Sequence, residues 1–283
     1  MVPSRPLRFA PAAVVLATAA FAATERVVCV SKQINEFLYA IGGAQDVLVG
    51  RDLTSVYPPE IKNVTSVGYH RALSAEGIIS LRPTLLLTDG NVGPDTVLDQ
   101  VKQVGIPVVV MAPGRTLESA QDLLKQLGQR LHREAQADKV LAEWNQGMDD
   151  VKKQAAQWQG KPRPRVLIMH FGQIVNDYLA VNRGGAADQV LAWAGGDNAI
   201  DAVKGMTRLT PELIAKAAPD IILATDVGYD RLGSAEKFGT VPGVALTPAG
   251  KAGRIYRIDE TEVMYYGPRT PAAVRHIANL LHP

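Results

Sequence analysis

The chain has 283 residues, of which 47% are hydrophobic and 20% charged, with a formal net charge of +2. This composition is typical of a globular protein with enough residues for two medium-sized domains, and it excludes a disordered chain. The charge balance excludes a general binder of nucleic acid, so we expect no nucleic-acid partner.

The N-terminus carries the pattern of a secretory signal peptide over residues 1–22. Arg5 and Arg8 precede an apolar, alanine-rich run over 10–21, which ends in the small-x-small order Ala20-Phe21-Ala22. The run is too short to span a membrane. Cleavage there would leave 261 residues (283 − 22) with 28 basic (30 − 2) and 28 acidic side chains. We therefore expect an exported protein with no net charge.

The first half alternates strand and helix patterns, which predicts a parallel α/β sheet. A strand over 26–30 contains Cys29, the single cysteine, which we interpret as a buried apolar residue. A helix follows, because Ile34, Phe37 and Ile41 fall on one face. The next expected elements are a strand at 47–49, a polar loop at 51–73, a helix at 95–104, a strand at 106–111 and a helix at 116–130.

One stretch occurs twice, at 74–88 and 210–224, and the copies align without a gap 136 residues apart. Each copy begins with a hydroxyl residue, Ser74 or Thr210, that can cap a helix. A glutamate, an apolar helix face, a proline and a short apolar strand follow. A repeated helix–strand unit predicts two similar lobes with a binding cleft between them.

A single long helix is predicted between the two lobes. Residues 132–159 contain no proline, and apolar positions recur at helical spacing from Val140 to Val151. A helix of up to 28 residues would be about 40 Å long at ~1.5 Å per residue. The expected organisation is an N-terminal lobe at 23–131, a bridging helix at 132–160 and a C-terminal lobe at 161–283. The fold class is thus α/β, with a mostly parallel central sheet in each lobe.

The second lobe restarts with a strand at 165–170 and ends with a strand at 255–258 and a C-terminal helix. Comparison of the two lobes indicates an inserted loop in each, at 51–71 and 171–185. Because loops carry function on a fixed scaffold, the binding residues are expected there.

The run from Gly68 to Gly77 has the order Gly-Tyr-His-Arg-Ala-Leu-Ser-Ala-Glu-Gly. It closely resembles the heme-binding branch of the periplasmic substrate-binding proteins of ABC importers, a class that also includes cobalamin and siderophore binders. The resemblance covers essentially the whole mature chain. It implies two α/β lobes bridged by one helix, a periplasmic location, and binding without catalysis. The implied ligand is ferric heme, and the implied partners are an ABC permease dimer in the inner membrane and an outer-membrane heme receptor upstream.

In the family that it resembles, the tyrosine of this run is the axial ligand of heme iron, which implies Tyr69. Phenolate is a hard donor suited to ferric iron, and a nearby guanidinium favours its ionisation. Arg71 and Arg231 are the expected guanidinium groups, and Tyr229 is expected to line the cleft. Other tyrosines and cations in loops were weaker candidates for walls or propionate partners: Tyr57, Tyr178, Tyr265, Tyr266, Arg183, Lys204 and Arg208. Without the resemblance, we would interpret Tyr69 as a loop tyrosine that packs on its own lobe.

Two histidines are candidates for the ligand site. His70 adjoins Tyr69 and stands where members of the family commonly have methionine. A role at the ligand site and a loop histidine that points to solvent are equally good interpretations of it. His170 ends a strand at the edge of the predicted cleft. Some heme-binding relatives hold a second heme on histidine, which implies such a role for His170, although a structural histidine fits as well. The remaining histidines, His132, His276 and His282, are expected on helices and in solvent.

Glu76 and Glu212 occupy the same place in the two copies of the repeat. As acids in a first helical turn, they fit the helix dipole. The resemblance implies that they dock the protein on the permease. Two alternatives remain for the whole chain: a binder of cobalamin or ferric siderophore, with Tyr69 as an aromatic wall, and a tetrapyrrole chelatase. A chelatase needs a histidine cluster with a carboxylate base, and the sequence shows no such spacing.

Overall fold

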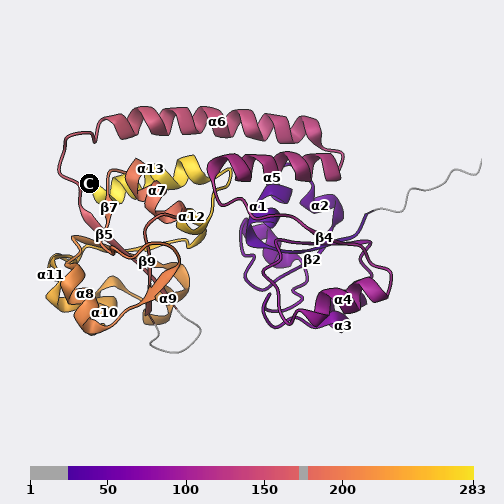
Figure 1. The fold of residues 1–283 in the computed structure, drawn as a ribbon, viewed down its shortest axis with the longest axis horizontal. Coiled ribbons are helices and arrows are strands. Elements are labelled where there is room, and N and C mark those ends of the chain that lie inside the picture. The colour runs from indigo at the N-terminus through magenta and orange to yellow at the C-terminus, as the bar shows by residue number, and fades with distance from the viewer. Residues whose placement is uncertain (1–24, 172–177) are drawn as a thin grey trace, which may run out of the picture.

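The computed structural model describes residues 25–171 and 178–283, and the predicted signal peptide lies outside them. Two α/β lobes stand side by side beneath one long helix (Figure 1). The predicted fold class is confirmed. The first half contains β1 (Val27–Val30), α1 (Lys32–Ala40), α2 (Ala44–Val47), β2 (Leu48–Arg51), η1 (Pro59–Asn63), α3 (Ala75–Ser80), β3 (Leu85–Thr88), α4 (Thr96–Gln103), β4 (Val108–Val110) and α5 (Leu117–Arg130).

The first lobe is built on a parallel sheet with strand order β2-β1-β3-β4. Both central strands are completely buried, because alternate side chains enter cores on opposite faces. Val27 and Leu85 pack with α1 and α5 on one face, whereas Val28 and Leu86 pack with α3 and α4 on the other. The apolar runs of the sequence thus become strands covered on both sides.

The second lobe contains β5 (Arg165–Phe171), β6 (Tyr178–Val181), α7 (Ala186–Trp193), β7 (Asp197–Asn198), β8 (Met206–Arg208), α8 (Pro211–Ala217), β9 (Ile221–Thr225), α9 (Asp226–Leu232), α10 (Ala235–Gly239), η2 (Val244–Leu246), α11 (Pro248–Ala252), β10 (Ile255–Ile258), α12 (Thr261–Met264) and α13 (Thr270–Leu281). Strands β10, β9, β5 and β7 pair in parallel, whereas β6 and β8 are antiparallel. The stretch at 171–185 was predicted as an inserted loop, and it instead contributes β6 to a mixed sheet.

The repeated unit has the same structure in both lobes. In the first, the amide of Gly77 donates to the Ser74 hydroxyl (3.4 Å), and α3 leads into β3. In the second, the amide of Leu213 donates to the Thr210 hydroxyl (3.2 Å), and α8 leads into β9. The caps predicted from the two hydroxyl residues are therefore present.

The bridging helix α6 (Glu134–Ala156) has 23 residues and is shorter than predicted. His132 has a φ of +53°, a left-handed conformation that separates α5 from α6 and places this histidine in a turn. Figure 1 shows α5 and α13 lying beneath α6, one from each lobe. At Gly147 a Cβ would lie 2.8 Å from the Pro271 ring, so the missing side chain lets α13 approach α6 closely. Trp144, 2% exposed, packs with Phe37 in a core that the two lobes share.

A buried carboxylate joins the lobes. Glu36 of α1 is 5% exposed, and Arg269 before α13 donates to both of its oxygens (2.6 and 3.1 Å). The Tyr265 hydroxyl also donates to Glu36 (2.8 Å), and burial beside this carboxylate holds the pKa of Tyr265 well above its usual range. The Arg269 guanidinium lies 3.4 Å from the centre of the Tyr57 ring. We call Glu36, Arg269, Tyr265 and Tyr57 the Glu36 cluster.

We expect Glu36→Gln to lower the free energy of unfolding by about 3 kcal/mol, because Arg269 would keep its charge and lose its nearest carboxylate, with only the more distant Asp259 (3.6 Å) left. Urea unfolding followed by circular dichroism measures the change. Glu143→Gln is the control, since Glu143 is 68% exposed in an ion pair with Lys139 at the surface of α6, where such pairs contribute under about 1 kcal/mol. Equal losses in the two variants would contradict a linking role for Glu36.

Candidate ligand-binding site

Tyr69 lies in a turn that hydrogen bonds hold from both sides. The amide of Ala72 donates to the Tyr69 carbonyl (2.8 Å) and closes the turn. Leu53 donates to the carbonyl of Gly68 on one side (2.7 Å), and Gly93 donates to the carbonyl of His70 on the other (2.8 Å). Gly68 has a φ of +102°, which a residue with a side chain rarely adopts. The backbone of the turn is therefore fixed before any ligand binds.

Two buried charged residues, Arg51 and Asp52, form hydrogen bonds in the segment that precedes this turn. Arg51 is 8% exposed, and its guanidinium donates to the carbonyls of Ile61 (2.9 Å) and Asp52 (3.0 Å). Asp52 is 1% exposed and accepts from the amide of Thr54 (2.8 Å) and from the hydroxyls of Thr54 and Ser55. The stretch predicted as a polar loop is thus a packed segment, and the sequence did not indicate the buried hydrogen bonds of Arg51 and Asp52.

The side chains of Tyr69 and His70 lie together. Their ring centres are 4.5 Å apart, with an angle of 58° between the planes. The Nδ1 atom of His70 lies 3.4 Å from the Thr54 hydroxyl and 4.0 Å from Asp52. Burial lowers the pKa of His70, although the negative charge of Asp52 opposes the shift. His70 is thus neutral at neutral pH and faces a buried carboxylate.

His170 lies in the second lobe at the end of β5. Its Nδ1 atom is 3.2 Å from the Thr225 hydroxyl and 3.7 Å from Glu260, whose carboxylate pairs with Lys32 of the first lobe. Burial lowers the pKa of His170, Glu260 opposes the shift, and the charge of Lys32 adds to it. Lys32 also lowers the pKa of His70. The two histidines therefore approach one ammonium group at the lobe interface.

Arg71 lies in the first lobe, whereas Tyr229 and Arg231 lie on the helix α9 of the second. Arg71 is exposed, and its guanidinium donates to the Asn91 side chain (3.1 Å). The loop predicted around Tyr229 is the helix α9, where Tyr229 is half-buried and stacks on Phe238 with 6.2 Å between ring centres. Arg231 is exposed on the same helix and forms no hydrogen bond or ion pair within the described ranges. Its place beside Tyr69 stays a prediction.

Several weaker candidates have structural partners instead. Tyr57 and Tyr265 belong to the Glu36 cluster, and the Tyr266 ring is buried. Arg183 donates to the carbonyl of Asn198 (2.9 Å) and pairs with Asp201 (3.3 Å). His282 was expected in solvent, and it stacks on Trp158 with 3.7 Å between ring centres.

The second lobe contains an aromatic cluster that no sequence pattern indicated. Phe171 meets the edge of Tyr178 (4.8 Å between ring centres) and of Phe238 (5.8 Å). At Gly228 a Cβ would lie 1.4 Å from the Phe171 ring, so a glycine is required there. The only available signal was the glycine that follows β9 closely.

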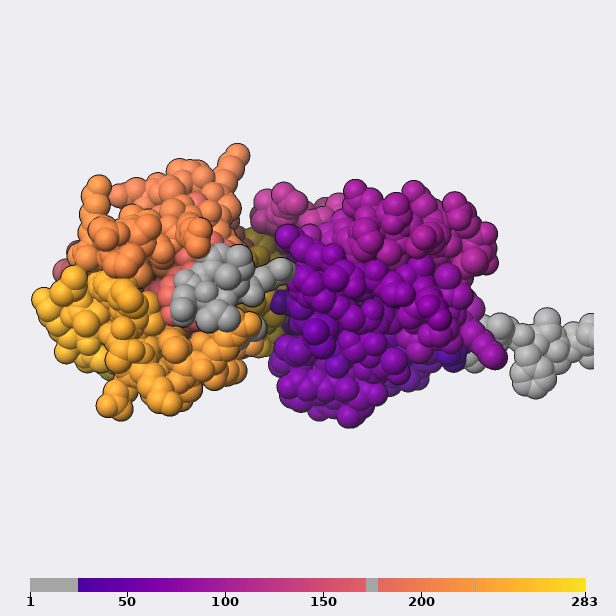
Figure 2. All heavy atoms as spheres, turned by 90° about the horizontal axis from the view of Figure 1, so that it is seen from below, coloured from indigo at the N-terminus to yellow at the C-terminus, as the bar shows by residue number. Residues whose placement is uncertain are grey.

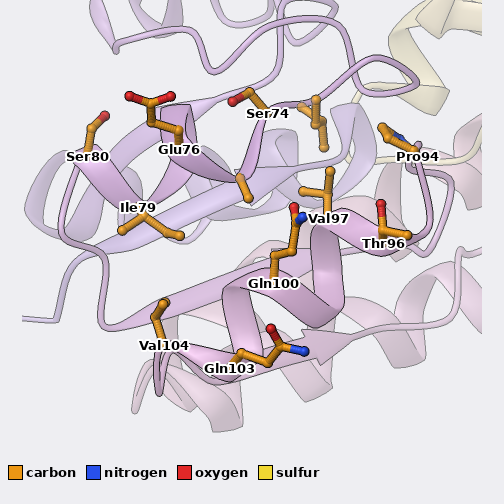
Figure 3. A pocket seen from close by; sticks show the side chains of 12 residues that line it. Ser74, Glu76, Ile79, Ser80, Pro94, Thr96, Val97, Gln100, Gln103 and Val104 are labelled. Atoms are coloured by element: carbon orange, nitrogen blue, oxygen red, sulfur yellow. The ribbon is translucent and has the colours of Figure 1, made fainter.

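Glu76 and Glu212 lie in the first turns of α3 and α8, the helices of the repeated unit. Glu76 is exposed beside an open groove of about 910 Å³ between α3 and α4, as Figure 3 shows. Apolar side chains, including Leu73, Ile79 and Val97, line the groove together with Gln100 and Gln103. Glu212 is exposed at the start of α8, where hydrogen bonds from the helix backbone and from Thr210 lower its pKa.

The lowered pKa of His170 predicts a loss of stability in acid. Because the folded protein holds this imidazole neutral below the ordinary pKa of about 6.5, the unfolded chain binds more protons, and the free energy of unfolding falls as the pH drops from 6.5 through the folded pKa. One such group contributes at most about 1.4 kcal/mol per pH unit. Urea unfolding of the ligand-free protein at pH 7.5, 6 and 5 should show a smaller fall for His170→Gln than for the wild type. The exposed control His132→Gln should behave as the wild type does. If the free energy of unfolding of His170→Gln fell as steeply with pH as that of His132→Gln, the prediction would be wrong.

No helix in the described ranges 25–171 and 178–283 is long and apolar enough to cross a membrane. The described residues also contain no group of three or more His, Cys, Asp or Glu that could hold a metal ion.

The chain matches the family model described as "Periplasmic binding protein" over residues 27–262. Its fold is similar to that of the periplasmic heme-binding protein BhuT in complex with two hemes, at 33% identity and a TM-score of 0.81, over 91% of this chain and 99% of that one. It is also similar to the periplasmic heme-binding protein RhuT from Roseiflexus sp. RS-1, at 30% identity and a TM-score of 0.82, over 92% and 98%. A vitamin B12-binding protein of Pectobacterium carotovorum is 24% identical over 94% of this chain and 91% of its own length. This chain therefore belongs to the periplasmic binding protein family.

Proposed function

We propose that the protein binds ferric heme between its two lobes, with the iron on the Tyr69 phenolate, and delivers it to an ABC permease. The observation that carries the proposal is the fixed turn at 68–72, which holds a tyrosine beside a histidine whose pKa the interface residue Lys32 lowers. The two heme-binding proteins of similar fold support it. The protein binds and releases its ligand without catalysis.

The donor set suits iron in a porphyrin. Phenolate and imidazole are both known axial donors to heme iron, and phenolate favours the ferric state. A free phenol ionises only near pH 10, so it needs the metal and a positive charge to ionise at neutral pH. Arg71 is two residues away, and Arg231 is the proposed guanidinium from the second lobe. We expect the half-buried rings of Tyr178 and Tyr229, which pack on the buried Phe171 and Phe238, to supply the flat apolar surfaces that a porphyrin requires.

Cobalamin is a second candidate ligand, since a relative of similar length is named for vitamin B12. Tyr69 would then be an aromatic wall rather than an iron ligand. A ferric siderophore remains within the same class. Titration with hemin and with cyanocobalamin separates these candidates directly. If the protein is exported as its N-terminus predicts, it acts in the periplasm, with an outer-membrane heme receptor as the expected upstream source.

We expect Tyr69→Phe to weaken ferric heme binding by about 100-fold, or about 2.7 kcal/mol, because it removes the phenolate–iron bond and keeps the ring. Absorbance titration with hemin measures the affinity and the phenolate-to-iron charge-transfer band, which should disappear. Tyr39→Phe, a tyrosine on α1 away from the turn, should bind as the wild type does. An unchanged spectrum for Tyr69→Phe would rule out Tyr69 as the ligand.

We also propose that Glu76 and Glu212 dock the protein on the permease. Each is exposed at the second position of a hydroxyl-capped helix, one in each lobe. An exposed pair of equivalent carboxylates fits a dimeric partner that offers two cationic sites. The groove beside Glu76 leaves room for an apolar side chain of that partner.

The double change Glu76→Ala with Glu212→Ala should leave the hemin spectrum and affinity unchanged and reduce heme delivery at least tenfold, because these charges speed and stabilise association. Delivery is measured with the importer reconstituted in vesicles. Glu118→Ala is a matched control, since Glu118 is exposed at the second position of the Thr116-capped helix α5. Normal delivery by the double variant would exclude the docking role.

A further inference from the structure

The imidazole of His70 has a fixed hydrogen-bonding partner on its Nδ1 side. The Thr54 hydroxyl donates to Asp52, so its oxygen can only accept from His70 Nδ1, at 3.4 Å. Asp52 lies just behind, 4.0 Å from the same nitrogen. This arrangement favours the tautomer with its proton on Nδ1 and leaves the lone pair on Nε2.

Asp52 cannot turn away from this position. Its Oδ2 accepts from the Thr54 amide (2.8 Å) and its Oδ1 accepts from the Ser55 hydroxyl, which in turn accepts from Asn35 (2.8 Å). The carboxylate is 1% exposed. A carboxylate held behind a histidine is the usual support of a metal-ligating imidazole, because it fixes both the tautomer and the ring.

His70 shares its turn with Tyr69, and the two rings are 4.5 Å apart. The side chain of His70 is 18% exposed, so the ring is not fully enclosed by its own lobe. One turn therefore carries two potential iron donors of different character. Phenolate is a hard anionic oxygen that favours ferric iron, whereas neutral imidazole binds both oxidation states.

We propose that His70 is a second iron ligand, which binds heme iron through Nε2 when the iron is ferrous, while Tyr69 binds it when ferric. The proposal rests on heme being the ligand of the proposed function. When an external one-electron reductant converts Fe(III) to Fe(II), the bond from iron to the Tyr69 oxygen breaks. The phenolate takes one proton from solvent, and the Nε2 lone pair forms the new bond.

His170 is the competing histidine at the lobe interface. Its Nδ1 also lies near a hydroxyl and a carboxylate, but that carboxylate, on Glu260, is paired with Lys32. The positive charge of Lys32 compensates Glu260, so His170 has weaker support as a ligand. Asp52, in contrast, has no cationic side chain other than His70 within ion-pair distance in the described part of the chain.

The test is resonance Raman spectroscopy of the hemin complex before and after reduction with dithionite. The wild type should show a tyrosinate signal when ferric and an iron–histidine stretch when ferrous. His70→Gln should keep the ferric signal and lose the iron–histidine stretch, and His170→Gln should keep both. Thr54→Val, which keeps the side-chain shape, should weaken ferrous heme binding about tenfold. Tyr69→Phe should retain hemin on histidine, and the double change with His70→Gln should not.

The contrary outcomes are distinct. An iron–histidine stretch that survives His70→Gln, or that disappears in His170→Gln, would overturn the proposal and leave heme binding intact. A wild type that binds no hemin would end both this inference and the proposed function. A readout without heme is nitrogen-15 NMR of the ligand-free protein. We expect the Nδ1–H tautomer for His70, and an Nε2–H tautomer would exclude it as a preformed ligand.

Discussion

The contact between Glu36 and Arg269 is the constraint on which the relative position of the two lobes depends. Each residue belongs to a different lobe, 233 positions apart in the chain. A guanidinium that meets a carboxylate through two hydrogen bonds has a fixed relative orientation as well as a favourable energy. The lobes therefore hold the turn at 68–72 and the helix α9 in a defined relation. The shared core under α6 acts in the same direction, so neither lobe can move without disturbing buried packing.

Charge at the lobe interface is nearly all compensated. Lys32 pairs with Glu260 across the interface, and the two histidines near Lys32 are neutral because burial lowers their pKa. A binding site built in this way has few mobile charges to reorganise when a ligand arrives, which lowers the cost of binding. The same neutrality leaves imidazole lone pairs available at neutral pH.

Short-range patterns in the sequence predicted the repeat, the helix caps and the central strands, because each depends on residues a few positions apart. The bounds of α6 were less accurate, since the left-handed backbone at His132 has no local signature. Contacts between distant residues were beyond such patterns. Lys32 and Glu260 are 228 positions apart, and neither has a motif around it. Asp52 appeared as one acid in a polar stretch, and only the folded turn brings it behind His70.

The internal repeat is broken in the surroundings of its two first helices, α3 and α8. Beside Glu76 the chain leaves an open groove, whereas at the equivalent helix of the second lobe the backbone packs directly on Pro211, where a Cβ at Gly243 would lie 2.4 Å from the Pro211 carbonyl oxygen. The two carboxylates are thus equivalent in charge and unequal in surroundings. On a partner whose two halves are identical, one half would gain an apolar contact that the other lacks. Docking would then make the two identical halves of the partner inequivalent. The half that binds the first lobe would have the extra apolar contact.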